Sequence, residues 1–137
     1  MGCDIHPFVE IRIKGIWYFL SYIDIGRNYA FFNALSGVRG ESKGYAEDNG
    51  VPDDSSQEVL DMVEAWEDDA HSHCHLYAHE VGGMLEYYEE CYPEIGSKKE
   101  DSFIHKELTA LENLKKLPHI EDVRMVAWYD NWNVKRL

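Results

Sequence analysis

Residue types that bind metals or transfer protons gather in two short stretches of the sequence. Four of the seven histidines lie within nine residues, with a cysteine among them: His71, His73, Cys74, His75 and His79. A second polar cluster, near the start of the chain, contains Cys3, Asp4 and His6. Imidazole, thiolate and carboxylate groups bind transition metals and move protons near neutral pH. If the fold brings the two clusters together, they form one site.

The first hypothesis for this chemistry is a metal site. His71 and His73 are separated by one residue, and this H-x-H spacing can make a two-ligand clamp. We expect a divalent metal, with zinc favoured because it accepts nitrogen, sulfur and oxygen ligands. The candidate ligands are Asp4, His6, His71 and His73, and Cys3 is a further donor. There is no zinc-finger spacing and no HExxH motif, so a histidine-rich surface turn is the alternative.

The second hypothesis uses no metal. His6 and His71 would act as general base and general acid on a phosphodiester. Ser72 would donate a hydrogen bond or act as nucleophile, and Glu10 would add a carboxylate from the face of the strand that carries His6. Arginines bind phosphate through two parallel hydrogen bonds, which makes four of them candidate ligand-binding residues: Arg12, Arg27, Arg39 and Arg124. In so acidic a chain, each arginine could instead be a surface ion-pair partner.

Charge and cysteine content limit the classes of function. The formal net charge is −13, which disfavours generic binding to DNA or RNA because such a surface repels polyanions. A small phosphorylated ligand is still compatible, since a few arginines can make a locally positive pocket. No apolar run approaches the ~20 residues of a membrane span. Three cysteines cannot all pair within one chain, and the N-terminus has no export signal, so we expect reduced thiols and a cytoplasmic location.

Alternating apolar and polar residues predict the strands that carry the N-terminal cluster of Cys3, Asp4 and His6. In residues 5–13 the isoleucines, Pro7 and Val9 share one face, while His6, Phe8, Glu10 and Arg12 share the other, with Asp4 in the same parity. Lys14-Gly15 predicts a turn into a second strand over residues 16–23, which completes a hairpin. A last strand is predicted over residues 123–129.

Helices are predicted over residues 27–35, ended by Gly37, and after the capping-box pattern Ser55 to Glu58, with Val59, Val63 and Trp66 on one face. Two more are predicted over residues 77–91 and after Asp101 or Ser102, the last ended by Pro118. Residues 71–76 are either a short strand, in which His71, His73 and His75 point the same way, or helical, which would pair His71 with His75.

Together these elements predict one domain, residues 1–137, of the α+β class. We expect a small antiparallel sheet, made of the N-terminal hairpin and the C-terminal strand, packed with three to four helices on one face. Residues 40–52 are rich in Gly, Asp and Asn and predict a mobile flap over the site.

The opening residues Met1 to His6, followed by Glu10 and Arg12, resemble a family of uncharacterised proteins, common in bacteriophage genomes, that begin MGCDIH. Further blocks extend the resemblance over almost the whole chain: residues 27–29, 37–39, 52–55, 69–72 and 123–131. The resemblance includes His71 and Ser72 but not Cys74, His75 or His79. The resemblance narrows the candidate site residues to Asp4, His6, Glu10, Arg27, Arg39, His71, Ser72, Arg124 and Asp130.

The resemblance implies no named activity, and a phage setting suggests anti-defence roles by analogy alone. Our main functional hypothesis is hydrolysis of a phosphorylated small molecule, a nucleotide, assisted by a metal or by histidine. The alternatives are a non-catalytic protein that sequesters a signalling nucleotide and an acidic protein–protein inhibitor. A phage-encoded protein would work in the host cytoplasm, and a homo-oligomer is an open option.

Overall fold

A computed structural model describes residues 2–94 and 102–131 and shows an antiparallel four-stranded sheet in the order β2-β1-β4-β3. Its strands are β1 Ile5–Ile13, β2 Ile16–Tyr22, β3 Ala70–Tyr77 and β4 Asp122–Asp130. The helices are α1 Tyr29–Ser36, α2 Gln57–Trp66, α3 Val81–Cys91 and α4 Phe103–Lys115, with 3₁₀ turns at Glu67–Asp69 and Ala78–Glu80. The predicted α+β class and the predicted hairpin are confirmed.

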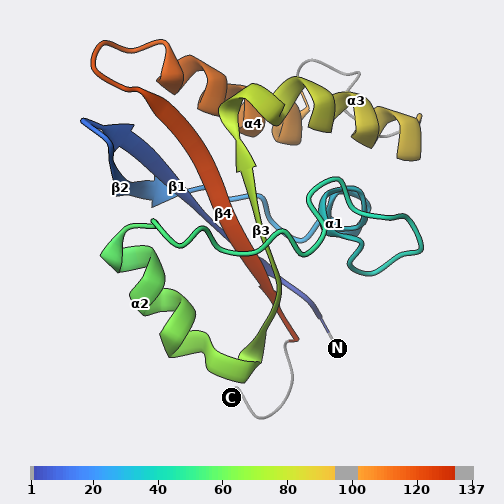
Figure 1. Cartoon of the computed structure of the whole chain (residues 1–137). Helices are drawn as coiled ribbons and strands as arrows, with labels where there is room; N and C mark the ends of the chain where they lie inside the picture. The colour runs from blue at the N-terminus through green and yellow to red at the C-terminus, as the bar shows by residue number, and fades with distance from the viewer. Residues whose placement is uncertain (1, 95–101, 132–137) are drawn as a thin grey trace.

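The first and last strands form the centre of the sheet (Figure 1). β1 and β4 pair along nearly their whole length, with Ile5 opposite Tyr129 and Arg12 opposite Asp122. Since opposite residues share a face, the alternation predicted for residues 5–13 continues in β4. The start of β1, the end of β4 and the start of β3 therefore meet at one end of the sheet.

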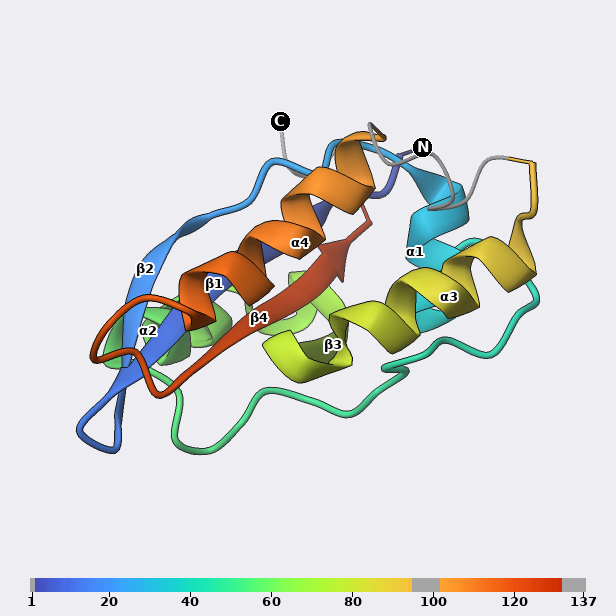
Figure 2. The same cartoon turned by 90° about the horizontal axis from the view of Figure 1, so that it is seen from above.

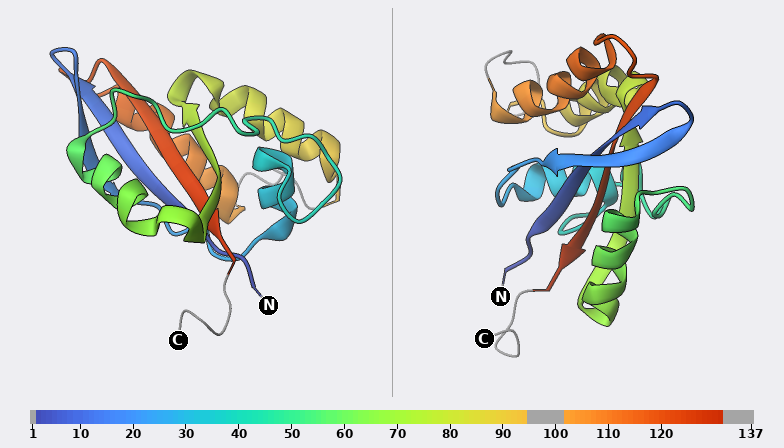
Figure 3. Two further views of the ribbon diagram at one scale, coloured as in Figure 1. Left: turned by 60° about the horizontal axis from the view of Figure 1, so that its bottom comes forward. Right: turned by 90° about the vertical axis from the view of Figure 1, so that its left-hand side faces the viewer.

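Helices cover both faces of the sheet, which corrects the expectation of helices on one face. The larger core lies beside α1, α3 and α4 and includes Val123, Met125 and Ala127 of β4. A smaller core on the opposite face packs Phe8 and Trp128 against α2. Figure 2 shows α4 in front of the sheet and α2 behind it, and the right view in Figure 3 separates α1 from α2 in the same way. A side chain at the sheet end therefore faces either α1 or α2.

Capping side chains fix the helix starts near the predicted positions. Asn28 accepts a hydrogen bond from the Phe31 amide at α1, and Ser56 accepts one from the Val59 amide at α2. Ser102 caps α4, whereas Asp101 lies outside the described residues. Helix α1 ends at Gly37, whose φ of +72° is the left-handed conformation that favours glycine.

The segment between α1 and α2 runs beside β3 rather than standing away from the sheet (Figure 1). The Gly50 amide donates to the His73 carbonyl, and the Asn49 side chain bonds both the amide and the carbonyl of His75. These bonds cover the outer edge of β3, which would otherwise expose unpaired backbone groups. None of the helices in the described part of the chain has the length and apolar character that a membrane crossing requires.

Candidate functional site

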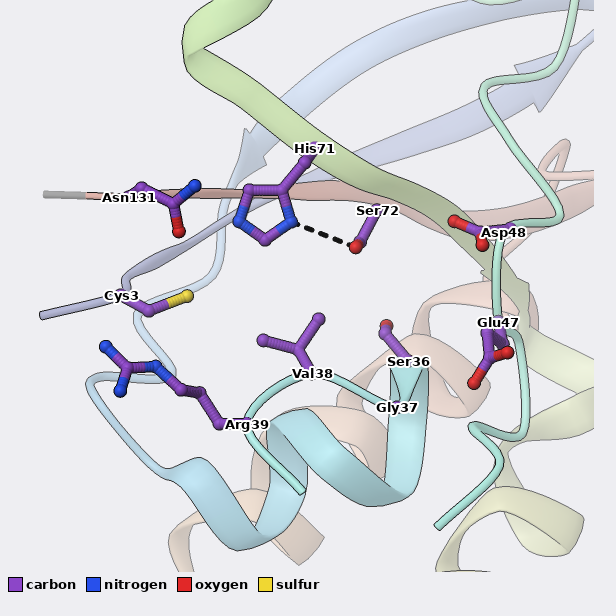
Figure 4. Close-up of a pocket in the computed structure, with 10 residues that line it drawn as sticks. All are labelled: Cys3, Ser36, Gly37, Val38, Arg39, Glu47, Asp48, His71, Ser72 and Asn131. Atoms are coloured by element: carbon purple, nitrogen blue, oxygen red, sulfur yellow. Dashed lines mark hydrogen bonds between the residues drawn. The ribbon is translucent and has the colours of Figure 1, made fainter. Parts of the chain in front are cut away.

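A cavity of about 410 Å³ lies at the end of the sheet where β1 and β3 begin and β4 ends, closed on one side by the end of α1 (Figure 4). Its volume falls in the range of small-molecule pockets, about 300–1,000 Å³. Three of the predicted catalytic and ligand-binding residues line it, Arg39, His71 and Ser72. Cys3, predicted as a further metal donor, also lines it, together with two residues that the sequence did not single out, Ser36 and Asn131.

A β-bulge in β3 directs His71 into this cavity. His71 pairs with Tyr129 and Cys74 pairs with Ala127, so three steps along β3 match two along β4. His71 therefore shares the α1 face of the sheet with Tyr129, on which its ring stacks at a centroid distance of 6.1 Å. The strand alternative for residues 71–76 is confirmed. The expectation that His71 and His73 point the same way is wrong, because the bulge adds one residue between the paired positions.

The hydrogen bonding of His71 leaves one ring nitrogen for a ligand. Its Nδ1 lies 2.9 Å from the Ser72 hydroxyl oxygen. Its Nε2 is buried, and no atom of the described residues forms a hydrogen bond with it. A buried polar atom without a partner costs free energy, which a bound ligand or water would recover. Ser72 has a φ of +55°, and Arg39 across the cavity has a φ of +62°. A positive φ in a non-glycine residue costs about 1–3 kcal/mol, and residues with such backbone strain are often found at functional sites.

Cys3 and Arg39 form the wall opposite His71 (Figure 4). Cys3 is only 1% exposed, and its amide donates to the Tyr29 hydroxyl at 3.2 Å. The Arg39 guanidinium lies 4.9 Å from the centre of the Tyr29 ring, beside Cys3 in the lining of the cavity. Burial raises the pKa of the Cys3 thiol and nearby Asp130 raises it further, while Arg39 opposes both effects. The thiol therefore needs a base before it can react as a thiolate.

Negative charge surrounds the rest of the cavity. Glu47 and Asp48 lie on its rim and are exposed. Glu47 accepts a hydrogen bond from the Gly44 amide at 2.9 Å and packs over Gly37, where an added Cβ would lie 2.1 Å from the Glu47 carboxylate. The carboxyl end of α1, which carries partial negative charge, also faces the cavity. A polyanion is therefore a poor fit, whereas a ligand with one anionic group can reach Arg39.

The structure places His6 on the other face of the sheet from His71. His6 pairs with Trp128 in β4, and its ring lies 4.3 Å from that of Trp66 in α2. Its Nε2 lies 2.7 Å from a carboxylate oxygen of Asp130, which is 2% exposed. His6 and His71 thus lie at the same end of the sheet but on opposite faces, and the expected pair of acid and base in one cavity does not form.

Asp4 and Arg27 form a clamp outside the cavity. The Arg27 guanidinium donates to both Asp4 carboxylate oxygens, at 2.9 and 3.0 Å. The Asp4 amide donates to the Asp130 side chain at 3.2 Å, and the Asp4 carbonyl accepts from the Asp130 amide at 3.0 Å. A Cβ at Gly2 would lie within 2.6 Å of the Arg27 guanidinium atoms. This interaction therefore positions the backbone on both sides of Cys3. It also engages Arg27, a predicted phosphate ligand, in a structural contact.

Replacing Arg27 with Gln is expected to raise the pKa of the Asp4 carboxyl toward its ordinary value of 3.8, because the hydrogen bonds from Arg27 hold it lower. In the wild type this interaction stabilises the fold above about pH 4, and the stabilisation is lost as pH falls through the lowered pKa. An NMR titration of the Asp4 carboxyl carbon measures the shift. The variant Arg12→Gln is the matched control, and an equal shift there would contradict the assignment.

Glu10 and Arg124 form a buried ion pair beneath α2 instead of lining the cavity. Both side chains are 0% exposed, and the Arg124 Nε lies 2.8 Å from the Glu10 carboxylate. Glu10 also accepts from the Ser56 amide at 2.7 Å. Arg12, another predicted phosphate ligand, pairs with Glu121 at 3.2 Å near the surface. The structure gives these three residues roles within the fold, and only Arg39 of the four candidate arginines lines the cavity.

The four candidate metal ligands do not converge. His73 lies against Trp128 on the α2 side of the sheet, at a ring distance of 5.9 Å, while His71 faces α1. Burial lowers the pKa of His73, and His71 lowers it further. Within residues 2–94 and 102–131, no group of three or more His, Cys, Asp or Glu side chains could hold a metal ion.

The fold and cavity thus define a small α+β protein with a thiol, an imidazole and a guanidinium at one end of its sheet. No family model, curated protein or solved structure matches the chain. The resemblance to phage proteins and the option of a homo-oligomer therefore stay predictions.

The sequence did not single out Ser36 and Asn131 as site residues. It predicted Cys3 only as a further metal donor, because nothing local distinguishes a cavity thiol from a core thiol. Ser36 ends α1 and Asn131 follows β4, so their convergence depends on the order of strands in the sheet. The sequence predicts which residues of β1 share a face of the sheet, but it does not predict which face α1 covers.

Proposed function

We propose that the cavity binds a nucleotide carrying one phosphate group and hydrolyses its phosphate ester, with His71 as the residue that transfers protons. The observation that carries the proposal is the state of the His71 ring: Nδ1 is held by Ser72, and Nε2 is buried without a partner in a cavity that also contains Arg39. This arrangement resembles that of general acid–base groups, in which one ring nitrogen is oriented and the other faces the reaction.

The proposed role in proton transfer requires a particular tautomer of the His71 ring. If Nδ1–H donates to the Ser72 hydroxyl, Nε2 carries the lone pair and can accept a proton from a nucleophile in the cavity. The protonated ring can then donate that proton to the leaving oxygen. Ser72 is in this view the residue that orients the ring, and its own use as a nucleophile is not needed.

The charge distribution supports a singly phosphorylated ligand. Arg39 provides a fixed guanidinium above the Tyr29 ring, which suits two hydrogen bonds to a phosphate. Glu47 and Asp48 at the rim would repel further phosphates but accept hydrogen bonds from hydroxyl or amino groups of the rest of the ligand. A nucleoside monophosphate or a cyclic nucleotide has this combination of groups, and a triphosphate does not. In a phage setting, such a reaction would remove a host nucleotide signal.

A second candidate is sequestration of the same ligand without chemistry. The observation that favours it is the position of His6, which leaves His71 as the single imidazole among the described residues that line the cavity. Binding needs Arg39 and the rim but no proton transfer. Recovery of unaltered ligand after denaturation of a loaded sample would favour this candidate over hydrolysis.

The test is a turnover assay on three probes: a nucleoside 5′-monophosphate, a cyclic mononucleotide and a nucleoside triphosphate. We expect hydrolysis of one of the first two, the triphosphate being the poorest substrate. Arg39→Gln should reduce kcat/KM about 10–100-fold, because a charge-assisted hydrogen bond contributes about 1.5–3 kcal/mol. Arg12→Gln is the matched control and should stay near the wild-type value.

The same assay separates the histidine and metal versions of the hypothesis. Turnover should be unchanged after treatment with EDTA. Loss of activity on chelation, restored by Zn²⁺, would support a metal site instead. If none of the probes is hydrolysed and none binds, the proposed function is wrong.

A further inference from the structure

The cavity contains a thiol that the proposed function has not used. Cys3 belongs to the segment before β1 and lies across the cavity from His71, in a lining that also includes Asn131 after β4 (Figure 4). We infer that Cys3 is the nucleophile of this site and that hydrolysis passes through a cysteinyl-phosphate intermediate. The inference rests on the proposed function and names the group that attacks the phosphorus.

The backbone around Cys3 is fixed on both sides, as a positioned nucleophile requires. The Cys3 amide donates to Tyr29, and the next residue, Asp4, is bonded to Asp130 through its backbone and to Arg27 through its carboxylate. Gly2 lies directly against the Arg27 guanidinium. This arrangement leaves the thiol little freedom of position at the wall of the cavity.

The neighbours of the thiol supply the two functions that a thiol nucleophile needs. His71 Nε2, which has no partner among the described residues, would accept the thiol proton. Arg39, which lines the same wall of the cavity as Cys3 and whose positive charge lowers the pKa of the thiol, would stabilise the thiolate and then the phosphate oxygens. The charged and titratable groups around the sulfur are Asp4, Asp130, Arg39, His71 and Tyr129. The two carboxylates favour the neutral thiol, so attack depends on the base.

The reaction proceeds in two balanced steps. In the first, the Cys3 proton moves to His71 Nε2, the sulfur forms a bond to phosphorus, and the bond from phosphorus to the leaving oxygen breaks. The leaving oxygen takes the proton from Nε2. In the second, a water molecule attacks phosphorus while Nε2 accepts its proton, the sulfur–phosphorus bond breaks, and the sulfur regains the proton. Phosphate leaves, and the enzyme returns to its starting state.

The other two cysteines provide internal controls. Cys74 is fully buried beside the Ser36 hydroxyl, and burial raises the pKa of its thiol to about 11. Cys91 ends α3 and is half-buried at a separate cavity. Among the described residues, Cys3 is the cysteine that shares a cavity with an imidazole and a guanidinium. Cys91→Ala therefore gives a background in which iodoacetamide can be used to compare Cys3 with Cys74.

The experiment uses full-length protein and p-nitrophenyl phosphate as the probe. After rapid acid quench, intact-mass analysis should find one phosphoryl group, and peptide mapping should place it on Cys3. Cys3→Ser, a close match in size, should lose the adduct and at least about 100-fold in turnover, and Cys74→Ser should lose neither. In the Cys91→Ala background, inorganic phosphate should protect Cys3 from iodoacetamide, and His71→Asn should slow its alkylation about tenfold or more.

The outcomes separate this inference from the proposed function. If Cys3→Ser keeps full turnover while His71→Asn loses it, the nucleophile is not Cys3 and the proposed function stands. If wild-type protein neither turns over any phosphate ester nor forms the adduct, both proposals are wrong. Circular dichroism of each variant checks that the fold is kept, and the alkylation rates in unaltered Cys3 test the inference even if Cys3→Ser fails to fold.

Discussion

Replacing Arg124 with Met is expected to lower the free energy of unfolding by about 3–5 kcal/mol, because it leaves the Glu10 carboxylate charged and buried without its partner. The Arg124 guanidinium also lies 3.8 Å from the centre of the Trp17 ring and bonds Asp54 at 3.0 Å. Methionine keeps much of the side-chain length, so the loss reports mainly the charge. Urea unfolding followed by tryptophan fluorescence measures it.

A second substitution isolates the cause. Glu10→Gln in the Arg124→Met background removes the stranded charge and keeps an oxygen that can accept from the Ser56 amide. The double variant should recover about 0.5–3 kcal/mol relative to Arg124→Met alone, the usual range for directly coupled residues. Arg12→Met, which breaks an exposed pair, should have a much smaller effect. Equal losses in Arg12→Met and Arg124→Met would show that the buried pair does not stabilise the fold.

This ion pair shows why charged residues on a strand face were misleading as site candidates. Glu10 and Arg124 are opposite each other in the pairing of β1 with β4, although 114 residues separate them. Their parity was predictable from the sequence, but their burial was not, because it depends on α2 covering that face. The polar face of residues 5–13 predicts site residues, but α2 covers it and makes it an interior face.

Regular local patterns were the predictable part of the fold. The alternation in residues 5–13, the cap at Ser102 and the capping-box pattern from Ser55 to Glu58 depend only on neighbouring residues, although the residue that caps α2 is Ser56. The bulge in β3 was not predictable, because Ser72 carries no glycine-like signal for its left-handed φ of +55°. Because of the bulge at Ser72, the two histidines of the H-x-H spacing lie on opposite faces of the sheet, His71 at the cavity and His73 on the α2 side.

The candidate site was likewise predictable only where it depends on local sequence. Arg39, His71 and Ser72 were identified from residue type, and their convergence with Cys3 was not, because it joins three segments that meet only through the sheet order. The sheet divides the N-terminal cluster: Cys3 faces the cavity, and His6 faces α2. The two clusters do meet, but through the thiol rather than through the imidazole or the Asp4 carboxylate.

Replacing His71 with Asn is expected to reduce kcat/KM for the nucleotide substrate about 10²–10⁴-fold, the range for loss of a general acid–base group. The variant should also lose the part of the pH–rate profile that depends on the ring. His79→Asn is the control, because His79 lies at a separate cavity, stacked on Tyr77, and its loss should leave turnover unchanged. Steady-state rates across a pH series measure both effects, and an equal loss in the two variants would contradict the role of His71.

Two substitutions of Ser72 separate orientation of the ring from backbone strain. Ser72→Ala and Ser72→Gly both remove the hydroxyl that holds His71 Nδ1, so turnover should fall about 5–10-fold in each, as expected for one hydrogen bond of about 1 kcal/mol. Their stabilities should differ, because alanine keeps the left-handed strain of about 1–2 kcal/mol that glycine relieves. If the two variants lose the same activity and Ser72→Gly is the more stable, the Ser72 hydroxyl contributes to catalysis. The backbone strain at Ser72 is then the cost in stability of placing that hydroxyl beside the His71 ring. If Ser72→Gly loses activity and Ser72→Ala keeps it, the backbone of the bulge, and not the hydroxyl, orients His71.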